Sequence, residues 1–245
     1  MDGIFKRDLI VTPDYCGASG ALSPLAAFTI FQGIAAQHAE VLGVGSSAMA
    51  EKGEFWLTVH TRVDLFERAY LMDELTVRTW AESCSERDVR TYRSYTLTRG
   101  ETVIARGKTE WAILGPEQKI IRFGDSGFPK DYPFPAETAI PEKLQRFHER
   151  FEEGDVFARY AVRPTDIDLG RHMNNVAYVR LLLDCFTAKE LASGDIRSVE
   201  LHYSTPCFEG EELTVYKKAE GGCCRIGIVK PDGRTASQAC VTFRK

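Results

Sequence analysis

The order of elements predicted in the first half of the chain recurs in the second half, and this duplication limits the fold more than any other feature. Each half shows a helical pattern of apolar residues followed by four strand-like runs. Pro13 and Pro164 stand at matching strand-to-loop positions 151 residues apart, and the same offset aligns Leu25 with Val176. The stretches 73–77 and 211–215, which read DELTV and EELTV, repeat at an offset of 138. The sequence therefore predicts two copies of one helix-and-sheet unit.

In the first half, a helix is predicted over residues 25–42. Ser23 is a suitable N-cap, Pro24 suits the first helical position, and Gly43 is typical of a helix end. Apolar residues cover several faces of this helix, which indicates that protein surrounds it. Runs rich in Val, Thr, Tyr and Trp then predict strands over residues 55–65, 74–82, 89–99 and 102–114.

A proline-rich segment separates the halves. Residues 116–154 contain five prolines and are expected to form a linker, with one short helix where Leu144, Phe147 and Phe151 share a face. Beyond it we expect a strand over 156–162, one apolar helix over about 175–193, and strands near 197–204, 212–219, 223–230 and 235–243. The predicted division is 1–115 for the first repeat, 116–154 for the linker and 155–245 for the second repeat.

Each unit on its own would leave a sheet edge unpaired. The predicted fold is therefore α+β, with each buried helix wrapped by an antiparallel sheet and the two sheets joined as a pseudo-dimer. A narrow apolar tunnel between helix and sheet would suit an extended hydrocarbon. Because fusion provides the pair within one chain, a further homodimer is compatible with the sequence but not required by it.

Charge and cysteine usage exclude several classes of function. The 245 residues carry a formal net charge of −4 with a pI of about 5.8, which gives no basic excess for binding nucleic acid. No run approaches the ~20 apolar residues of a membrane span. The seven cysteines are irregularly spaced and no secretory or transit segment is recognisable, so a cytoplasmic protein with reduced thiols is expected. Cys223 and Cys224 lack the further ligands of a zinc site, and no metal or cofactor is predicted.

The most informative segment connects a strand to the start of the second helix. It reads RPTDIDLGRHMNNVAY over residues 163–178. Asp168 lies four residues before His172, and both precede Asn174 and Asn175 at the expected helix start. A carboxylate, an imidazole and backbone N–H groups in one small volume suit the hydrolysis of a thioester, which needs an activated water and a stabilised oxyanion.

The asparagines have an ordinary alternative role. Either could cap the helix, and for this pair we favour capping or positioning over a chemical role. Asp168 and His172 differ, because the matching loop YCGASGA at residues 15–21 contains neither a carboxylate nor an imidazole. A purely structural need would be expected in both copies.

This segment resembles the catalytic loop of the acyl-acyl carrier protein thioesterases of bacteria and plant plastids. The resemblance covers essentially the whole chain, including the first helix, the strand with Trp56 and the proline-rich linker. Its signature, Asp-x-x-x-His-x-Asn-Asn-x-x-Tyr, is formed by Asp168, His172, Asn174, Asn175 and Tyr178. The resemblance implies a double-hotdog hydrolase that releases a free fatty acid from an acyl carrier protein, with its active site in the second repeat.

By this resemblance Asp168 is the essential carboxylate, His172 its partner in polarising water or the carbonyl, and Cys207 the cysteine of the following strand. The chain departs from the family pattern at Gly170, where the family often has Asn, and at Pro206, where plant members have Glu. Without that Asn, a Cys-His-Asn nucleophilic scheme lacks its orienting member. Direct attack by water with Asp168 as general base is therefore favoured, and Cys207 is equally well explained as a small buried hydrophobe.

The first repeat, which has no catalytic loop, is expected to provide the acyl pocket between its helix and the strand with Trp56, Thr58 and His60. Core packing explains Phe28, Phe31 and Trp56 equally well. A local cluster of cations in the second half would attract an acidic carrier, although solvated surface charge explains each member too. These cations are Arg159, Arg163, Arg171, Arg180, Lys189 and Arg197.

Two alternatives stay open at this point. A hydrolase of acyl-coenzyme A would use the same chemistry on an acyl group that is carried by coenzyme A instead of a carrier protein. A non-catalytic acyl-binding hotdog protein would keep the pocket and need neither Asp168 nor His172. A hotdog dehydratase is disfavoured, because Glu40 is the only comparable acid that the first helix offers to pair with a histidine of the other repeat.

Overall fold

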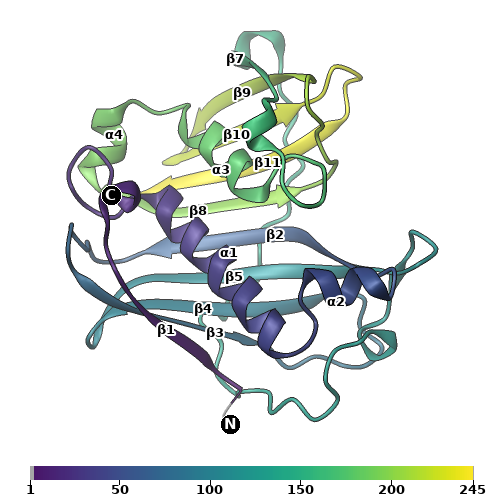
Figure 1. Cartoon of the computed structure of the whole chain (residues 1–245). Helices are drawn as coiled ribbons and strands as arrows, with labels where there is room; N and C mark the ends of the chain where they lie inside the picture. Colours follow the sequence, from purple (N-terminus) through teal and green to yellow (C-terminus); the bar gives the residue numbers. More distant parts are fainter. Residues whose placement is uncertain (1–2, 245) are drawn as a thin grey trace.

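One continuous antiparallel sheet forms the body of the molecule, and the helices lie against one of its faces (Figure 1). This computed structural model describes residues 3–244. The strands are β1 Phe5–Ile10, β2 Phe55–Leu65, β3 Glu74–Ala81, β4 Thr91–Arg99, β5 Thr102–Leu114, β6 Ile120–Ile121, β7 Val156–Ala161, β8 Ile196–Tyr203, β9 Glu212–Glu220, β10 Cys223–Val229 and β11 Thr235–Phe243. They are ordered β1-β3-β4-β5-β2-β8-β11-β10-β9-β7, and β6 pairs with β5 off this path.

The strand order is the same in both halves when it is read outward from β2 and β8. β2 is followed by β5, β4, β3 and β1, and β8 is followed by β11, β10, β9 and β7. β2 and β8 pair antiparallel, with Val63 opposite Val199. This pairing covers the inner edge of each sheet, and it confirms the predicted α+β tandem hotdog with its two sheets joined.

The first helix is the long one that the sequence predicts. α1 (Pro24–Val41) begins after Ser23, whose hydroxyl accepts a hydrogen bond from Ala26 N at 3.1 Å. It ends just before Gly43, whose φ of 71° suits a residue without a side chain. α1 crosses the sheet of the first half and buries Phe28 and Phe31 (Figure 1). α2 (Ser46–Glu51) follows on the longer loop of this half.

The second helix is shorter than predicted. The single helix expected over residues 175–193 is divided into α3 (Asn175–Leu183) and α4 (Ala188–Ser193). Thr187 explains the break, because its hydroxyl accepts from Glu190 N while the Glu190 carboxylate accepts from Thr187 N. This capping box starts a new helix. Cys185 and Phe186 between the two helices are buried, so the chain turns into the core there.

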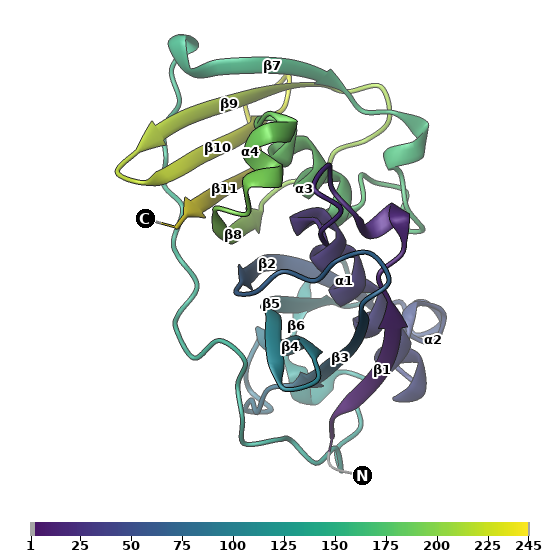
Figure 2. The same cartoon turned by 90° about the vertical axis from the view of Figure 1, so that its left-hand side faces the viewer.

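The first part of the linker packs beside the end of α1 and α2, where Phe128 and Tyr132 join Val44 and Met49 in a small apolar cluster. Its second part runs between the two halves along the face of the sheet opposite to the helices (Figure 2). The short helix predicted around Leu144, Phe147 and Phe151 does not form. Phe147 packs instead against the ring of His60, and Phe151 packs against Tyr216 on the other side of the seam. Helical spacing would place these two rings on one face, whereas the irregular backbone lets each reach a different strand.

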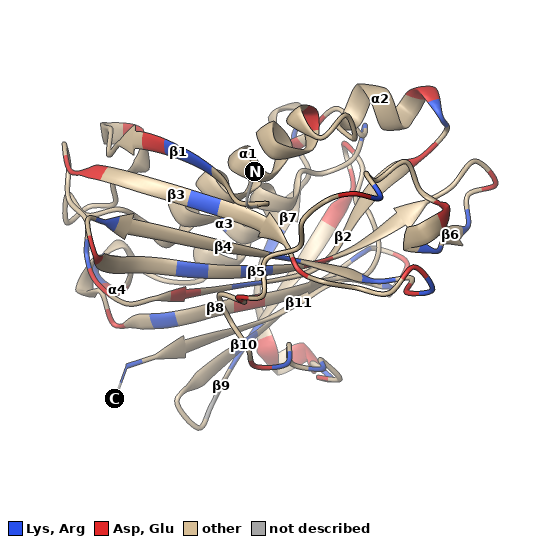
Figure 3. Cartoon of the chain, turned by 90° about the horizontal axis from the view of Figure 1, so that it is seen from below, with Lys and Arg blue, Asp and Glu red and all other residues tan. Residues whose placement is uncertain are grey.

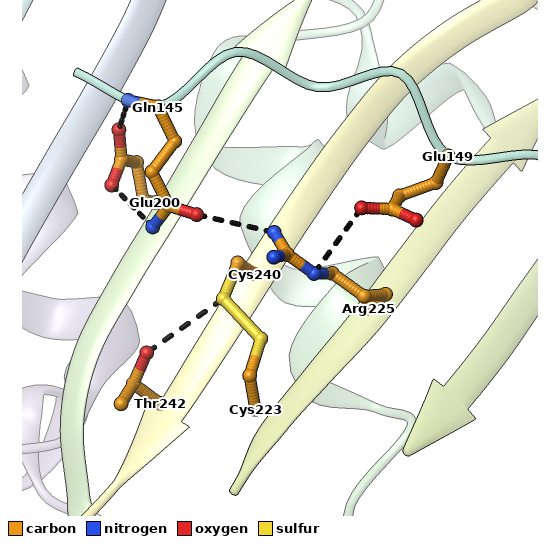
Figure 4. The surroundings of a disulfide bond; sticks show 7 residues. All are labelled: Gln145, Glu149, Glu200, Cys223, Arg225, Cys240 and Thr242. Atoms are coloured by element: carbon orange, nitrogen blue, oxygen red, sulfur yellow. Dashed lines mark hydrogen bonds and ion pairs between the residues drawn. A yellow bond between two sulfur atoms is a disulfide. The ribbon is translucent and has the colours of Figure 1, made fainter. Parts of the chain in front are cut away.

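Polar contacts fasten the linker to β8 and β10 (Figure 4). The Glu200 carboxylate accepts hydrogen bonds from both the backbone N and the side-chain amide of Gln145. Arg225 pairs with Glu149 at 3.3 Å and donates to the side chain of Gln145 at 3.1 Å. The second part of the linker is therefore a packed layer on the outer face of the sheet.

Cys223 and Cys240 are joined by a disulfide between β10 and β11 (Figure 4). The expectation that all thiols are reduced is therefore wrong for this pair, while the other five cysteines are free. Pairing of β10 with β11 sets Arg225 opposite Cys240 and Cys223 opposite Thr242, so the two cysteines are diagonal neighbours on adjacent strands. Spacing along the sequence gives no indication of that register.

Charges of both signs are interspersed along the strands and loops (Figure 3). Two of the cations expected to attract a carrier are already paired, Arg159 with Glu212 and Arg180 with Asp166. Pairing reduces what these two contribute to a positive surface patch. Within residues 3–244, no helix combines the length and apolar character needed to cross a bilayer.

Close contact between α1 and the sheet depends on Gly107 of β5. A Cβ at this position would lie 2.7 Å from the ring of Phe31 and 3.1 Å from that of Tyr95. We therefore predict that Gly107→Ala destabilises the fold by about 1–3 kcal/mol through overpacking. The midpoint of urea unfolding measures this change.

Gly33→Ala is the matched control, because Gly33 is exposed on α1 and a Cβ there meets nothing within 4 Å. Alanine in a helix interior is expected to stabilise by roughly 0.5–1 kcal/mol relative to glycine. A Gly107→Ala protein as stable as the native chain would show that α1 and the sheet are packed less closely than these distances indicate.

Candidate active site

Asp166 fixes the loop between β7 and α3 from inside. Its buried carboxylate accepts hydrogen bonds from the Tyr160 hydroxyl at 2.6 Å, from Arg163 N at 2.9 Å and from the Arg180 guanidinium. Burial raises the pKa of Asp166, but these hydrogen bonds outweigh it and the net pKa is lowered. Ionised Asp166 therefore ties the loop to Tyr160 on β7 and to Arg180 on α3.

This loop is a backbone copy of the matching loop in the first repeat. Both contain the same three features, 151 residues apart: a 3-10 turn, an isolated β-bridge and one residue in the left-handed region. In the first repeat these are Pro13–Tyr15, Cys16 with Leu22, and Gly20. In the second they are Pro164–Asp166, Ile167 with Met173, and Arg171. The two loops differ in their side chains rather than in their course.

Asp168 and His172 occupy the positions where the first loop has Gly17 and Ala21. Asp168 N donates to His172 O at 3.1 Å, as Gly17 N donates to Ala21 O at 2.8 Å. Because the same turn forms around glycine and alanine, it requires neither a carboxylate nor an imidazole. Side chains at these two positions are therefore free to serve chemistry.

Two donors orient the Asp168 carboxylate. Gly170 N donates to Oδ1 at 2.8 Å, and Asn174 Nδ2 donates to Oδ2 at 3.3 Å. His172 Nδ1 lies 4.0 Å from Asp168 Oδ1, which is within ion-pair range but beyond a direct hydrogen bond. The side chains are 26% exposed for Asp168 and 36% for His172. A solvent molecule can thus reach the carboxylate and the imidazole together.

The His172 ring is oriented by backbone and leans over Gly170. Its Nδ1 lies 3.2 Å from Met173 O. A carbonyl only accepts, so the neutral ring in this contact carries its proton on Nδ1 and leaves Nε2 unprotonated. A Cβ at position 170 would lie 2.8 Å from Nε2. The ring thus occupies the space where the Asn of the family pattern would begin, which gives the departure at Gly170 a physical meaning.

Asn174 and Asn175 connect the loop to its surroundings. Asn174 is the N-cap of α3, with Oδ1 accepting from Val176 N at 2.8 Å while Nδ2 reaches Asp168. Asn175 Nδ2 donates to Thr58 Oγ1 of β2 at 2.8 Å. These contacts agree with capping and positioning, and direct binding of substrate by either residue stays a prediction.

Cys207 lies in the core behind the loop. It is fully buried, its backbone N donates to the Tyr178 hydroxyl at 3.0 Å, and its O accepts from Met173 N. Burial raises the pKa of its thiol, against a smaller opposing effect of the Tyr178 hydroxyl. In the first repeat Leu22 N donates in the same way to Ala69 O, so Ala69 is its counterpart. A buried, protonated thiol is poorly suited to act as a nucleophile.

A small cavity lies beside the start of α3, between α1 and the sheet of the first repeat. Its volume is about 30 Å³, which admits a water but not an acyl chain without movement of side chains. Aromatic rings, hydroxyls and amides line it, among them Phe28, Phe31, Thr58, Tyr95, Trp111 and Asn175. Where the sequence predicts an acyl pocket between the first helix and its sheet, the structure has only this narrow, partly polar cavity.

The residues that the sequence assigned to the pocket are separated in the structure. Thr58 lines the cavity, whereas Trp56 packs edge-on against Trp111 and donates its N–H to Val44 O at 2.9 Å. Sequence reasoning missed Trp111 and Tyr95. The register of β2 with β5, which sets Trp111 opposite Thr58, is the information that would have identified Trp111.

Family models of known proteins match both halves of the chain. The acyl-ACP thioesterase N-terminal domain matches residues 3–123, and the C-terminal domain matches residues 149–245. Oleoyl-acyl carrier protein thioesterase 1, chloroplastic, of Arabidopsis thaliana is 20% identical over 97% of this chain and 71% of its own length. The chain spans between 59% and 71% of the plant relatives that it matches.

Solved structures share the whole fold. An acyl-ACP thioesterase from Bacteroides thetaiotaomicron superposes with a TM-score of 0.87 at 21% identity, covering 99% of this chain and 98% of that one. A 12:0-ACP thioesterase from Umbellularia californica gives 0.82 at 16% identity, covering 98% and 97%. Together the two family models cover most of the chain, which therefore belongs to the acyl-ACP thioesterase family and is a thioester hydrolase.

Proposed function

We propose that the chain releases fatty acids from acyl carrier protein by direct attack of water, with Asp168 as general base and His172 as its partner. The contrast between the two loops carries this proposal. Both have the same backbone, yet only the second holds a carboxylate and an imidazole 4.0 Å apart in a solvent-accessible position. The first loop forms the same turn without these two side chains, so the fold of the loop does not require them.

The proposed reaction begins with a water held between two acceptors. One hydrogen points to the Asp168 carboxylate and the other to His172 Nε2, which leaves an oxygen lone pair for the thioester carbonyl carbon. As the new C–O bond forms, Asp168 takes the proton. When the C–S bond breaks, that proton passes to the pantetheine thiolate, and the carboxylate is restored. The partial positive charge at the N-terminus of α3 favours the oxyanion.

The carrier is proposed to approach across the same loop. Leu169 is 92% exposed, and the nearby Phe208 is 47% exposed. Arg171 is also exposed and forms no ion pair with any other residue of the described range 3–244. Apolar side chains beside an unpaired cation suit the surface of an acidic partner. Association of two chains into a homodimer stays a prediction.

Replacement of the proposed general base tests the mechanism. Asp168→Asn is expected to lower kcat by about 10²–10⁴-fold, because the amide cannot accept the proton of water. Its melting temperature should match that of the native chain, since Gly17 supports the same turn. Asp14→Asn in the first repeat's loop is the control and should leave kcat unchanged. Near-native turnover by Asp168→Asn would remove Asp168 from the mechanism.

Cys207→Ala separates attack by water from attack by a thiol. We expect kcat within about threefold of the native value, because the thiol is not needed and the counterpart Ala69 shows that the fold accepts alanine there. Steady-state hydrolysis of an acyl-carrier substrate measures this. A loss as deep as that of Asp168→Asn, in a folded protein, would favour a covalent acyl-cysteine route.

Charge reversal on the loop tests whether the enzyme recognises the carrier protein of its substrate. Arg171→Glu should raise the KM for acyl carrier protein about tenfold at low salt, with the difference shrinking as salt screens the charge. Hydrolysis of a small acyl-pantetheine thioester should not change. Arg87→Glu, at an exposed position between β3 and β4 of the first repeat, is the control. Equal KM values in both variants, or a higher kcat/KM for acyl-coenzyme A than for acyl carrier protein, would contradict the proposed docking.

A further inference from the structure

A second and larger cavity, of about 240 Å³, lies beside the loop of the first repeat. One wall comes from that loop and the start of α1. The opposite wall comes from the second repeat, where the end of α3, α4 and the start of β8 contribute residues. The cavity is therefore formed between the repeats and depends on their union.

This cavity is the twofold equivalent of the small one beside the start of α3. Three of its lining residues are counterparts, 151 residues apart, of three that line the small cavity: Pro24 and Asn175, Leu25 and Val176, Leu183 and Gln32. Gly17 and Ala21, which stand in place of the acid and the imidazole, line it as well. The larger cavity thus adjoins a loop that has the backbone of the Asp168 loop without its acid and imidazole.

Two arginines mark one end of the cavity. The Arg68 guanidinium donates to Ala192 O at 3.3 Å, and that of Arg244 donates to Leu65 O at 3.2 Å. Arg244 N also donates to Asp195 O. Asp195 is three residues after Ala192, the partner of Arg68, so both guanidinium groups lie at the same end of the cavity. Neither forms an ion pair with a carboxylate in the part of the chain that the structure describes. A guanidinium has five N–H donors, so both keep donors for an anion.

The remaining lining is mainly apolar. Its large apolar side chains are all leucine or isoleucine: Leu22, Leu25, Leu65, Ile104, Leu183, Leu191 and Ile196. Arg180 also lines the cavity and is neutralised by Asp166. The carboxylates in the wall are Glu67 and Asp184, and neither forms an ion pair with Arg68 or Arg244 in the described part of the chain. An apolar chamber with two available guanidinium groups at one end suits a ligand with a hydrocarbon tail and an anionic head.

We propose that this cavity binds a medium-chain fatty carboxylate without reacting with it. The tail would lie along the leucine and isoleucine side chains, and the carboxylate would accept hydrogen bonds from Arg68 and Arg244. A volume of about 240 Å³ is below the roughly 300–1,000 Å³ of sites for drug-sized ligands, which favours one short or medium chain. The site would give the non-catalytic repeat a function of its own.

Calorimetric titration with octanoate tests the proposal on the intact chain. Arg68→Gln removes one cation, and binding at this site should weaken by roughly 10- to 100-fold. Ala188→Leu, at an exposed position of α4 that lines the cavity, fills the chamber and should abolish this binding. 1-Octanol, which has the same tail without charge, should bind at least about tenfold more weakly to the native chain.

Two control variants change the same side-chain types outside the cavity. Arg197→Gln removes an exposed arginine of β8, and Lys189→Leu adds a leucine beside Ala188 on α4; both should bind octanoate as the native chain does. Octanoate affinity that is unchanged in both Arg68→Gln and Ala188→Leu would overturn the proposal, as would equal affinity for octanoate and octanol. Because binding is measured without turnover, the result does not depend on the role of Asp168.

Discussion

The antiparallel pairing of β2 with β8 is the constraint on which the rest of the structure depends. Each half alone would expose an inner strand edge with unpaired N–H and C=O groups. Joining the edges makes one sheet and sets the start of α3 against the first repeat, where Asn175 reaches Thr58. Both cavities have walls from both repeats, so neither would exist in a single unit. Fold and site therefore follow from one edge-to-edge contact.

Polar residues at this seam specify its register. His60 and Glu200 are both buried and form a pair at 3.0 Å, and Glu200 stands opposite Arg62 in the ladder. A slip by one residue would turn Glu200 to the other face of the sheet and leave its charge without these partners. Burial raises the pKa of Glu200, but hydrogen bonds from His60 and Gln145 outweigh it and lower the pKa. Such a pair contributes more to choosing one register than to net stability.

Local patterns in the sequence predicted the elements well because their causes are local. The Ser23 cap, the apolar faces of α1 and the β-branched runs act within a few residues, and three strands, β2, β5 and β11, have the predicted bounds. The failures come from contacts between distant residues. Phe147 and Phe151 pack against residues of different strands instead of forming one face of a helix. The disulfide depends on the register of β10 with β11, and Trp56 packs edge-on against Trp111 instead of lining the cavity. The loop of Asp168 was predicted because duplication provides an internal comparison.

Duplication also connects the larger cavity to the loop of Asp168 through one residue. Arg180 lines the larger cavity, and its guanidinium holds Asp166, which fixes the loop that bears Asp168. A ligand that changes the Arg180–Asp166 contact must change the energy of that loop, and substrate bound at the loop must change the affinity for the ligand by the same factor. The twin loops need no identical side chains, since backbone hydrogen bonds hold both. One copy could therefore gain an acid and an imidazole while the other kept a larger chamber.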